Sequence, residues 1–309
     1  MISSQEKIAL IILQWNRSTD TLACIESVLR IEYPHYEILI VDNGSDPHEL
    51  RAVRQAFPEL TYIENQSNLG FAEGNNRGIQ VALARGADYI LILNNDTTVD
   101  PHLLTAFLSA ARAYPEAGVF GAKIYYFEDP TDIWYAGGQV DPRLLRCYHE
   151  GCTESDLHKN HEQIKDTGYA CGCALFIKRE VIQKIGMMDP RFFLLWEEID
   201  WCWRIRQGGY RCLFVPQAKV WHKISRSFIE GNRGPSWQYF YFRNRLLFIQ
   251  RHIPWKQRLI FYTTIFLREL LEMITLCLHP KTSSARRKLN TAALKGICHY
   301  FLKVSLHKN

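Results

Sequence analysis

The chain has 309 residues, 47% hydrophobic and 22% charged, which is ordinary for a globular protein and long enough to bury a sizeable core. Its nine cysteines are odd in number and scattered, so a disulfide framework is disfavoured and reduced thiols are expected. Residues 1–7 lack a basic stretch followed by an apolar one, which excludes a signal peptide there, and we expect a cytosolic location.

The net charge of +5 is distributed unevenly along the chain. Residues 231–309 contain 14 Lys and Arg and two acidic residues, a balance of +12. The first 230 residues contain 23 basic and 30 acidic groups, a balance of −7. This asymmetry indicates that the basic C-terminal quarter faces an anionic partner.

Strands and helices are predicted to alternate over the first 100 residues. Bounded apolar runs predict strands at residues 7–13, 36–41, 60–64 and 89–93. Start signals predict three helices, the first capped by Thr19 or Asp20, the second led by Pro47 and the third opened by residues 68–78. The alternation predicts a mostly parallel α/β sheet with helices on both faces. The glycines of the third helix match neither a dinucleotide fingerprint nor a P-loop, which disfavours those two chemistries.

Polar residues follow the fourth predicted strand, in the segment Asn94-Asn95-Asp96. Asp100-Pro101 comes next, and we expect it to supply the N-cap and first residue of a helix. Asp96 is then predicted at the carboxyl end of a central strand, where open α/β sheets bind ligands. A carboxylate beside two amides suits a hard divalent cation that holds a phosphate. The alternative is that these residues only form a turn.

Further strands are predicted at residues 117–126, 171–177 and 211–221, the last as a strand pair or one kinked strand. Between the first two we expect a turn at residues 134–138 and a polar loop, whose His and Cys spacing matches no zinc motif. The last strand ends at His222. A histidine there is either an ordinary satisfied side chain or a further ligand for a metal held by Asp96.

Three acidic residues open a helix that Gly208-Gly209 ends: Glu197, Glu198 and Asp200. Carboxylates in a first turn complement the helix dipole, which is a sufficient structural explanation. Neighbouring tryptophans favour a second explanation. Desolvation by these rings raises the pKa of a carboxylate and makes it a workable general base.

Five segments in this order resemble the family 2 glycosyltransferases of GT-A fold, especially their bacterial rhamnosyltransferase-like branch. The resemblance covers about residues 7–225. The matching segments are Val41-Asp42-Asn43-Gly44-Ser45, Asn68-Leu69-Gly70-Phe71-Ala72, Leu93-Asn94-Asn95-Asp96, Glu197-Glu198-Ile199-Asp200 with Arg204 and Gly209-Tyr210, and His222 with Ser225 and Ser227.

The resemblance implies a role for each matching position. Nucleotide contacts are implied for Asp42, Asn43, Asn68, Gly70, Phe71 and Asn95. Asp96 and His222 are implied to hold Mg²⁺ or Mn²⁺ on the diphosphate of a sugar nucleotide. The family's Asp-x-Asp motif has Asn94 in place of its first acid here, so this site has one carboxylate fewer.

The same resemblance implies the catalytic base and the acceptor site. The family's Glu-Asp pair corresponds to Glu197-Glu198, and we favour Glu198 as the base over Glu197 and Asp200. Residues implied beside the acceptor are Trp196, Arg204, Arg243 and Asn244. One base with no second nucleophile fits single displacement with inversion, an expectation that rests on the resemblance.

The C-terminal region lies outside the shared core, and we divide the chain into a catalytic domain at 1–228 and a helical appendage at 229–309. The apolar run 259–278 has the length of a membrane span, but Arg268, Glu269 and Glu272 interrupt it. Three central charges are costly in a span, whereas an amphipathic helix at the surface of an anionic membrane tolerates them. No nucleic-acid module accompanies the aromatic and basic residues here, so we expect no nucleic-acid partner.

We therefore expect a metal-dependent, inverting glycosyltransferase at the inner face of the cell membrane. The expected donor is dTDP-rhamnose or otherwise a UDP-sugar, and the acceptor is a lipid-linked glycan or polysaccharide. Two alternatives are a sugar-nucleotide pyrophosphorylase, whose Gly-rich N-terminal loop is lacking, and a non-catalytic nucleotide-sugar-binding protein.

Overall fold

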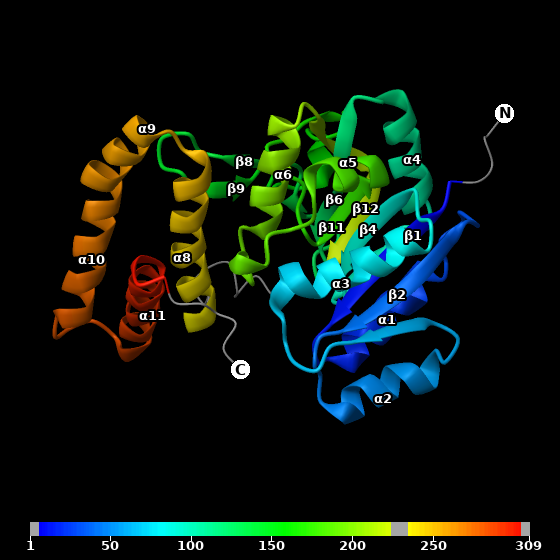
Figure 1. The fold of residues 1–309 in the computed structure, drawn as a ribbon, viewed down its shortest axis with the longest axis horizontal. Helices are drawn as coiled ribbons and strands as arrows, with labels where there is room; N and C mark the ends of the chain where they lie inside the picture. The colour runs from blue at the N-terminus through cyan, green and yellow to red at the C-terminus, as the bar shows by residue number, and fades with distance from the viewer. Residues whose placement is uncertain (1–5, 224–233, 304–309) are drawn as a thin grey trace. The chain divides into compact units, whose positions relative to one another are not determined.

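The computed structural model describes residues 6–223 and 234–303, which fall into two compact units (Figure 1). Within these residues the first unit comprises 6–139, 149–189 and 198–223, and the second comprises 140–148, 190–197 and 234–303. The predicted boundary at 228/229 and the motif residues Ser225 and Ser227 lie outside the described residues. The second unit also takes two short segments from the predicted catalytic domain.

A large mixed sheet forms the centre of the first unit. Its strands are β1 (Ile8–Gln14), β2 (Tyr36–Asp42), β3 (Thr61–Glu64), β4 (Tyr89–Asn94), β5 (Thr97–Val99), β6 (Ala117–Tyr126), β7 (Ile133–Tyr135), β10 (Lys165–Asp166), β11 (Ala174–Lys178) and β12 (Arg211–His222). The main order is β10-β12-β6-β11-β4-β1-β2-β3, with β5 paired to β12 and β7 to β6. Strands β4, β1, β2 and β3 are parallel as predicted, whereas β11 runs antiparallel to both of its neighbours.

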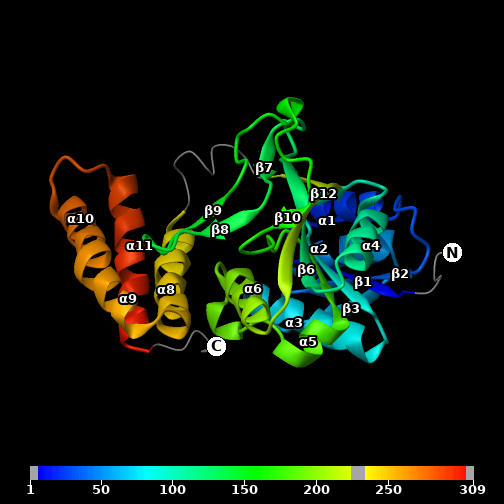
Figure 2. The same ribbon diagram turned by 90° about the horizontal axis from the view of Figure 1, so that it is seen from above.

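Helices cover both faces of this sheet (Figures 1 and 2). The helices are α1 (Ser18–Val28), α2 (Pro47–Ala56), α3 (Gly70–Ala84), α4 (Leu103–Ala113), α5 (Arg179–Ile185) and α6 (Glu197–Gln207), with a short 3₁₀ turn η1 (Asp156–His158). A second 3₁₀ turn, η2 (Pro190–Phe192), belongs to the second unit. Because both faces are covered, the central strands are continuous apolar runs, and all ten residues of β6 are buried. The predicted fold class is confirmed.

Two predicted helix starts are wrong. Helix α1 begins at Ser18, and the residue before it, Arg17, is left-handed and gives no side-chain cap, so neither Thr19 nor Asp20 caps it. Helix α4 begins at Leu103 rather than at Pro101. The Asp100 carboxylate accepts a hydrogen bond from the backbone N–H of His102 at 2.8 Å, which makes a turn ahead of the helix.

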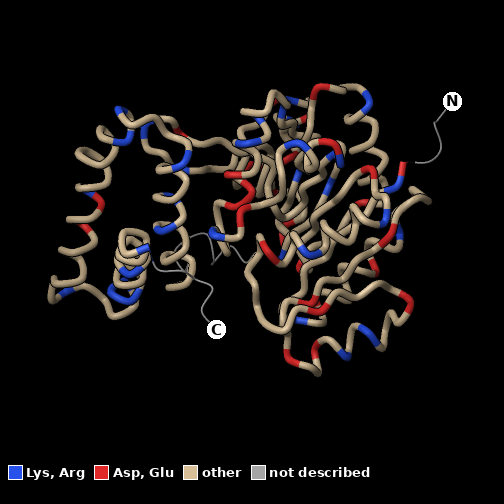
Figure 3. Tube along the Cα trace, viewed as in Figure 1, with Lys and Arg blue, Asp and Glu red and all other residues tan. Residues whose placement is uncertain are grey.

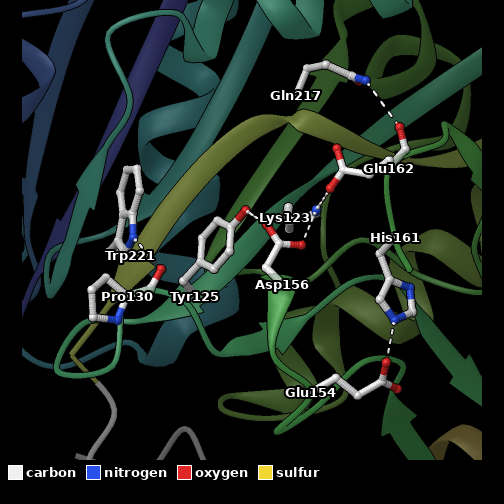
Figure 4. Close-up of polar contacts among 9 residues, drawn as sticks. All are labelled: Lys123, Tyr125, Pro130, Glu154, Asp156, His161, Glu162, Gln217 and Trp221. Carbon is white, nitrogen blue, oxygen red and sulfur yellow. Dashed lines mark hydrogen bonds and ion pairs between the residues drawn. The ribbon is translucent and has the colours of Figure 1, made fainter. Parts of the chain in front are cut away.

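Residues 127–166 have more regular structure than the predicted turn and polar loop. Residues 133–135 form strand β7 rather than part of a turn, while β8 (Gly138–Val140) pairs with β9 (Cys147–His149). We call residues 127–166, which follow β6, the excursion. A buried ammonium holds it in place: Lys123 Nζ on β6 lies 2.7 Å from both Asp156 and Glu162 (Figure 4). Strand β12 is one continuous strand with a register shift between Val215 and Lys219, which confirms the kinked alternative.

Helices form most of the second unit. They are α8 (Pro235–His252), α9 (Trp255–Ile260), the π-helical η3 (Phe261–Phe266), α10 (Leu267–Leu278) and α11 (Ser284–Phe301). Helix α11 packs against α8 and α10, and Glu269 is buried in ion pairs with Arg245 at 2.7 Å and Arg146 at 2.5 Å. In the part of the chain that the structure describes, no helix is long and apolar enough to cross a membrane.

Candidate active site

The carboxyl ends of three parallel strands meet at one edge of the sheet. In the register of the sheet, Gln14 at the end of β1 pairs with Asp42 at the end of β2, and Leu13 pairs with Asn94 at the end of β4. The polar segments predicted to follow separate strands therefore lie together. The loop 171–173 borders the same edge, because the backbone N–H of Asn94 donates to the carbonyl of Cys173 at 3.0 Å.

Asp96 and His222 form a close pair at this edge. Strand β5 runs antiparallel to β12 and aligns Thr97 with His222, which brings the ends of two distant segments together. As a result, Oδ1 of Asp96 lies 2.9 Å from Nε2 of His222. Burial opposes ionisation of Asp96, but the charge and hydrogen bond of His222, with a smaller contribution from Arg17, outweigh it and lower the pKa of the carboxyl. Asp96 is thus a carboxylate at neutral pH.

This pair has the donor atoms that a divalent cation takes. A carboxylate oxygen and an imidazole nitrogen already converge, and both suit Mn²⁺, while Mg²⁺ prefers the carboxylate. Among residues 6–223 and 234–303 no group of three or more His, Cys, Asp or Glu side chains is placed to hold a metal. The pair therefore fits a cation whose remaining ligands come from a bound diphosphate and water.

A cavity of about 420 Å³ opens beside Asp42. Its lining residues are Asp42, Gly44, Ser45, Pro47, Leu50, Arg51, Arg54, Glu64, Asn65 and Gln66. Oδ2 of Asp42 accepts from the backbone N–H of Ser45 at 3.2 Å, and its buried Oδ1 has no hydrogen-bond partner among the described residues. An unpaired buried acceptor at a cavity wall suits a donor on a ligand.

Sequence reasoning missed Gln14, which lies in register with Asp42. Its side chain is fully buried, and neither its amide oxygen nor its amide nitrogen has a partner within the described part of the chain. The available signal was a glutamine that ends an otherwise apolar strand. Buried polar groups without a partner are rare in native proteins, and a bound ligand or water beside Asp42 would give the Gln14 amide its partners.

Most of the predicted nucleotide residues hold the loop that surrounds the site. The amide of Asn43 donates to Asn68 Oδ1 at 3.0 Å and to the carbonyl of Gly70 at 3.1 Å, and its oxygen accepts from the N–H of Leu69. The Asn68 side chain also accepts from the N–H of Gly70, the first residue of α3, at 2.8 Å. Asn95 donates to Thr21 at 3.0 Å. Their contact with a nucleotide remains a prediction.

Glu198 and the predicted nucleotide residue Phe71 both lie close to Gly172. A Cβ added to Gly172 would lie 3.1 Å from the Phe71 ring and 3.7 Å from Cβ of Glu198, so this glycine allows the two side chains to approach from opposite elements. Burial raises the pKa of Glu198 to about 7, although the backbone N–H groups of Glu198 and Ile199 oppose the shift. Its Oε2 has no hydrogen-bond partner among the described residues.

The other two acids of this segment differ from Glu198. Asp200 is fully buried, and its Oδ2 accepts from Nε of Arg204 at 2.8 Å, one turn further along α6. Arg204 donates to the carbonyls of Ile185 and Met187 as well, so its guanidinium is used within the fold. Glu197 is only 4% exposed. The assignment of Glu198 as the catalytic base remains a prediction.

Three predicted acceptor residues belong to the second unit and have structural contacts there. The fully buried amide of Asn244 donates to the carbonyls of Phe192, Leu194 and Leu195, at 2.5, 2.8 and 2.8 Å. Arg243 donates to the carbonyl of Arg191 at 2.8 Å, and the Trp196 ring packs against Tyr241 and Phe248. These contacts shape the segment ahead of Glu197, and direct acceptor contact remains a prediction.

The mixed sheet with helices on both faces, and with the carboxylate–histidine pair at the carboxyl ends of its strands, has the arrangement of the GT-A fold, as predicted. The chain belongs to glycosyl transferase family 2, whose family model matches residues 9–186.

Curated relatives support the same family. An N-acetylglucosaminyl-diphospho-decaprenol L-rhamnosyltransferase of Mycobacterium tuberculosis is 26% identical over 209 residues, which are 62% of this chain and 67% of the relative. The galactofuranosyltransferase GlfT2 of the same species is 24% identical over 286 residues, 85% of this chain and 44% of the relative. A low-salt glycan biosynthesis hexosyltransferase of Haloferax volcanii, Agl10, is 27% identical over 219 residues, 68% of this chain and 66% of the relative. The chain therefore spans about two thirds of these relatives or less.

Solved structures confirm the fold. The mannosyltransferase PcManGT from Pyrobaculum calidifontis, in complex with GDP-Man and Mn²⁺, aligns with a TM-score of 0.58 and 14% identity over 97% of this chain and 88% of that chain. GalNAc-T7 with UDP, GalNAc and Mn²⁺ aligns with a TM-score of 0.62 and 14% identity over 98% of this chain and 57% of that chain.

Proposed function

We propose that the protein is a metal-dependent, inverting glycosyltransferase that moves a sugar from a nucleotide donor to a lipid-linked or polysaccharide acceptor. The observation that carries this proposal is the 2.9 Å approach of Asp96 Oδ1 to His222 Nε2 at the edge of the sheet. Glu198 on helix α6 lies close to Gly172, in the loop that borders this edge. Family membership supports the reaction type.

Each of these residues has a task that follows from its position. Asp42 accepts a hydrogen bond from the base of the nucleotide in the adjoining cavity. Asp96 and His222 hold the divalent cation, Mg²⁺ or Mn²⁺, which when bound neutralises negative charge on the departing diphosphate. Glu198 takes the proton from the acceptor hydroxyl as this oxygen attacks the anomeric carbon, and a pKa near 7 suits that role.

The donor and acceptor rest on relatives. One relative is named as a rhamnosyltransferase that acts on a decaprenol-linked sugar, another as an O-antigen biosynthesis protein, RfbC of Myxococcus xanthus. We therefore place dTDP-rhamnose first, with UDP-sugars as the alternative, and a lipid-linked glycan as the acceptor.

Unit two carries a surface that suits an anionic membrane. Exposed apolar side chains recur at helical spacing from α9 to α10, at Leu259, Ile260, Leu267, Leu271, Ile274 and Leu278. Lys and Arg lie on the neighbouring helices α8, α9 and α11, whereas α10 itself carries Arg268 with Glu269 and Glu272 (Figure 3). An apolar stripe on a unit that is basic as a whole suits binding in the headgroup region of an anionic bilayer. We propose peripheral contact with the inner face of the membrane, where a lipid-linked acceptor is presented.

A donor panel tests the function. dTDP-rhamnose and several UDP- and GDP-sugars are incubated with the protein and Mn²⁺, and donor binding and hydrolysis are measured for the wild type, Asp96→Asn and Glu198→Gln. We expect one donor to bind with metal, Asp96→Asn to abolish metal-dependent binding, and Glu198→Gln to bind normally but turn over about 10²–10⁴-fold more slowly. Asp100→Asn is the matched control, because its side-chain oxygen keeps the turn bond to His102.

Two outcomes would overturn the proposal. Metal-dependent binding with no turnover on any acceptor would favour a non-catalytic binding protein. Formation of a sugar nucleotide from a nucleoside triphosphate and a sugar phosphate would favour a pyrophosphorylase.

A further inference from the structure

Strand β7 brings an indole ring to the predicted metal site. Trp134 is the central residue of this short strand, which pairs antiparallel with β6. Its ring centroid lies 4.9 Å from that of His222, with the planes at 68°. Trp134 is only partly exposed. Trp134 lies in none of the five segments on which the resemblance to the family rests.

The imidazole of His222 lacks the support that metal-bound histidines usually have. Such a histidine normally donates its second ring N–H to a carboxylate or a carbonyl, which fixes the orientation of the ring. In His222, Nε2 is directed at Asp96, while Nδ1 is buried and has no hydrogen-bond partner among residues 6–223 and 234–303. The orientation of the His222 ring must therefore be fixed by packing. The edge-on contact with the Trp134 indole supplies that packing.

Trp134 is itself held firmly. His149 packs edge-on against its indole with centroids 4.6 Å apart and planes at 88°. Nδ1 of His149 also lies 3.3 Å from the backbone carbonyl of Trp134. Further along the same segment, the Lys123 ammonium donates to one carboxylate oxygen of Asp156. The second oxygen of Asp156 accepts a hydrogen bond from the Tyr125 hydroxyl at 2.7 Å (Figure 4). These contacts fix the backbone that presents the indole.

We propose that Trp134 is a positioning residue that holds the His222 imidazole where its Nε2 and Oδ1 of Asp96 converge on the divalent cation. This inference rests on the proposed function, since it assigns a determinant of cation affinity at that site. Trp134 acts through His222 and touches neither the sugar nor the acceptor.

The test measures cation affinity directly. Mn²⁺ is titrated into the protein in the presence of UDP, dTDP or GDP, and free Mn²⁺ is followed by its electron paramagnetic resonance signal. The variants are Trp134→Phe, which keeps an aromatic edge, Trp134→Leu, which keeps apolar bulk, and Trp134→Ala. Trp221→Ala is the matched control. It removes an indole from the residue before His222, where Trp221 stacks on Tyr125 with centroids 5.6 Å apart.

We expect Trp134→Ala and Trp134→Leu to weaken Mn²⁺ binding about tenfold or more, the range seen when support of a metal ligand is lost. Trp134→Phe should stay within about threefold of the wild type, and Trp221→Ala should match it. Thermal unfolding checks that each variant is folded. If Trp134→Ala does not fold, Trp134→Leu is used in its place for the comparison with the wild type. Nucleotide affinity without metal should not change.

The contrary results are distinct. Equal Mn²⁺ affinity in the wild type and Trp134→Leu, with a raised KM for donor or acceptor, would make Trp134 a substrate contact and overturn the inference alone. Loss of affinity in Trp221→Ala as large as in Trp134→Ala would reduce the effect to general destabilisation of β12 and overturn it as well. A wild type that binds no Mn²⁺ with any of the nucleotides would overturn the metal site of the proposed function and, with it, this role.

Discussion

The carboxyl group of Glu198 is predicted to control the pH dependence of the reaction. Burial raises its pKa from 4.5 to about 7, and a general base works only when it is deprotonated. The single-turnover rate with saturating donor should therefore rise tenfold per pH unit below about 7 and level off above it. Glu180→Gln, a substitution on α5, should leave this profile unchanged. If the logarithm of the rate shows no change of slope between pH 5.5 and 8.5, Glu198 is not the general base.

The same pKa predicts an effect on stability. The folded state binds the proton of Glu198 more tightly than the unfolded chain does, so stability from this group is present at low pH and is lost as pH rises from about 4.5 to about 7. Glu198→Gln should therefore stabilise the protein at pH 8 by about 1–3 kcal/mol and change little at pH 4. Urea unfolding at the two pH values measures the difference, and an equal effect at both would contradict the buried carboxyl.

Gly44 is required for backbone reasons at the wall of the cavity beside Asp42, where we propose that the nucleotide binds. Its φ is +73°, and an added Cβ would lie 2.6 Å from two backbone atoms of Ser67. Gly44→Ala should therefore destabilise the protein by about 2–4 kcal/mol and weaken nucleotide binding. Gly186→Ala is the control, since φ there is +85° with no atom within 4 Å, and it should cost about 1 kcal/mol. Equal losses of unfolding free energy would show that the contact with Ser67 is unimportant.

The site residues that could be predicted from the sequence are those whose residue type and position in a strand both indicate a ligand-binding role. Asp42 ends an apolar strand and Asp96 lies two residues beyond another, so the carboxyl edge of a parallel sheet was the expected place for them, and the structure agrees. Gln14 and Trp134 were missed because their importance depends on burial and on a partner far away in the chain. Trp134 lies 88 positions before His222, and no local pattern joins them.

At the scale of elements, the excursion 127–166 depends on one buried cation. The side chain of Lys123 is fully buried, whereas Asp156 and Glu162 are 20% and 50% exposed. Replacing both acids by Asn and Gln leaves an ammonium buried among neutral groups and should cost about 2–4 kcal/mol. Lys123→Met keeps the volume and leaves the acids access to water, so it should cost less, about 0–2 kcal/mol. Thermal unfolding of both variants checks the order, and the reverse order would contradict it.

Element types were more predictable than element ends. The apolar runs of β1, β2, β4 and β6 were found because burial on both faces makes them continuous. The start of α4 was misplaced because an Asp-Pro pair fits both a helix start and the turn that it makes here. Strands β7 and β8 were missed because three residues are too few to show a period.

At the scale of the whole molecule, the charge division predicts where the protein binds lipid. Leu271 and Leu278 are 55% and 78% exposed on α10, so Leu271→Glu with Leu278→Glu should leave the fold intact. Burying a leucine in a bilayer contributes about 1.5–3 kcal/mol, so the double variant should bind vesicles of anionic phosphatidylglycerol at least about tenfold more weakly. Sedimentation with the vesicles measures this.

Two controls separate lipid binding from other effects. Leu157→Glu changes an equally exposed leucine, 76%, in the first unit and should not alter binding. Raising salt from 0.1 to 0.5 M should weaken binding, because salt screens the attraction between Lys and Arg and the anionic headgroups. Neutral phosphatidylcholine should weaken it as well, because its headgroups carry no net charge. Vesicle binding that changes neither with lipid charge nor with the two leucine substitutions would contradict the proposed membrane contact.

The segment ahead of Glu197 sets a limit on engineering this protein for heat resistance. Phe193, Leu195 and Trp196 have φ values of 60°, 68° and 74°, a region that costs a bulky residue about 1 kcal/mol or more, and the Asn244 amide holds their neighbours in place. At Leu195, which is only half-buried, glycine or asparagine would relieve that cost and raise the melting temperature. The rings of Phe193 and Trp196 are packed against other aromatic side chains, so the same change there would lose more than it gains. Relief at Leu195 would loosen the lead into helix α6, so variants selected only for heat tolerance should accumulate there at the expense of turnover.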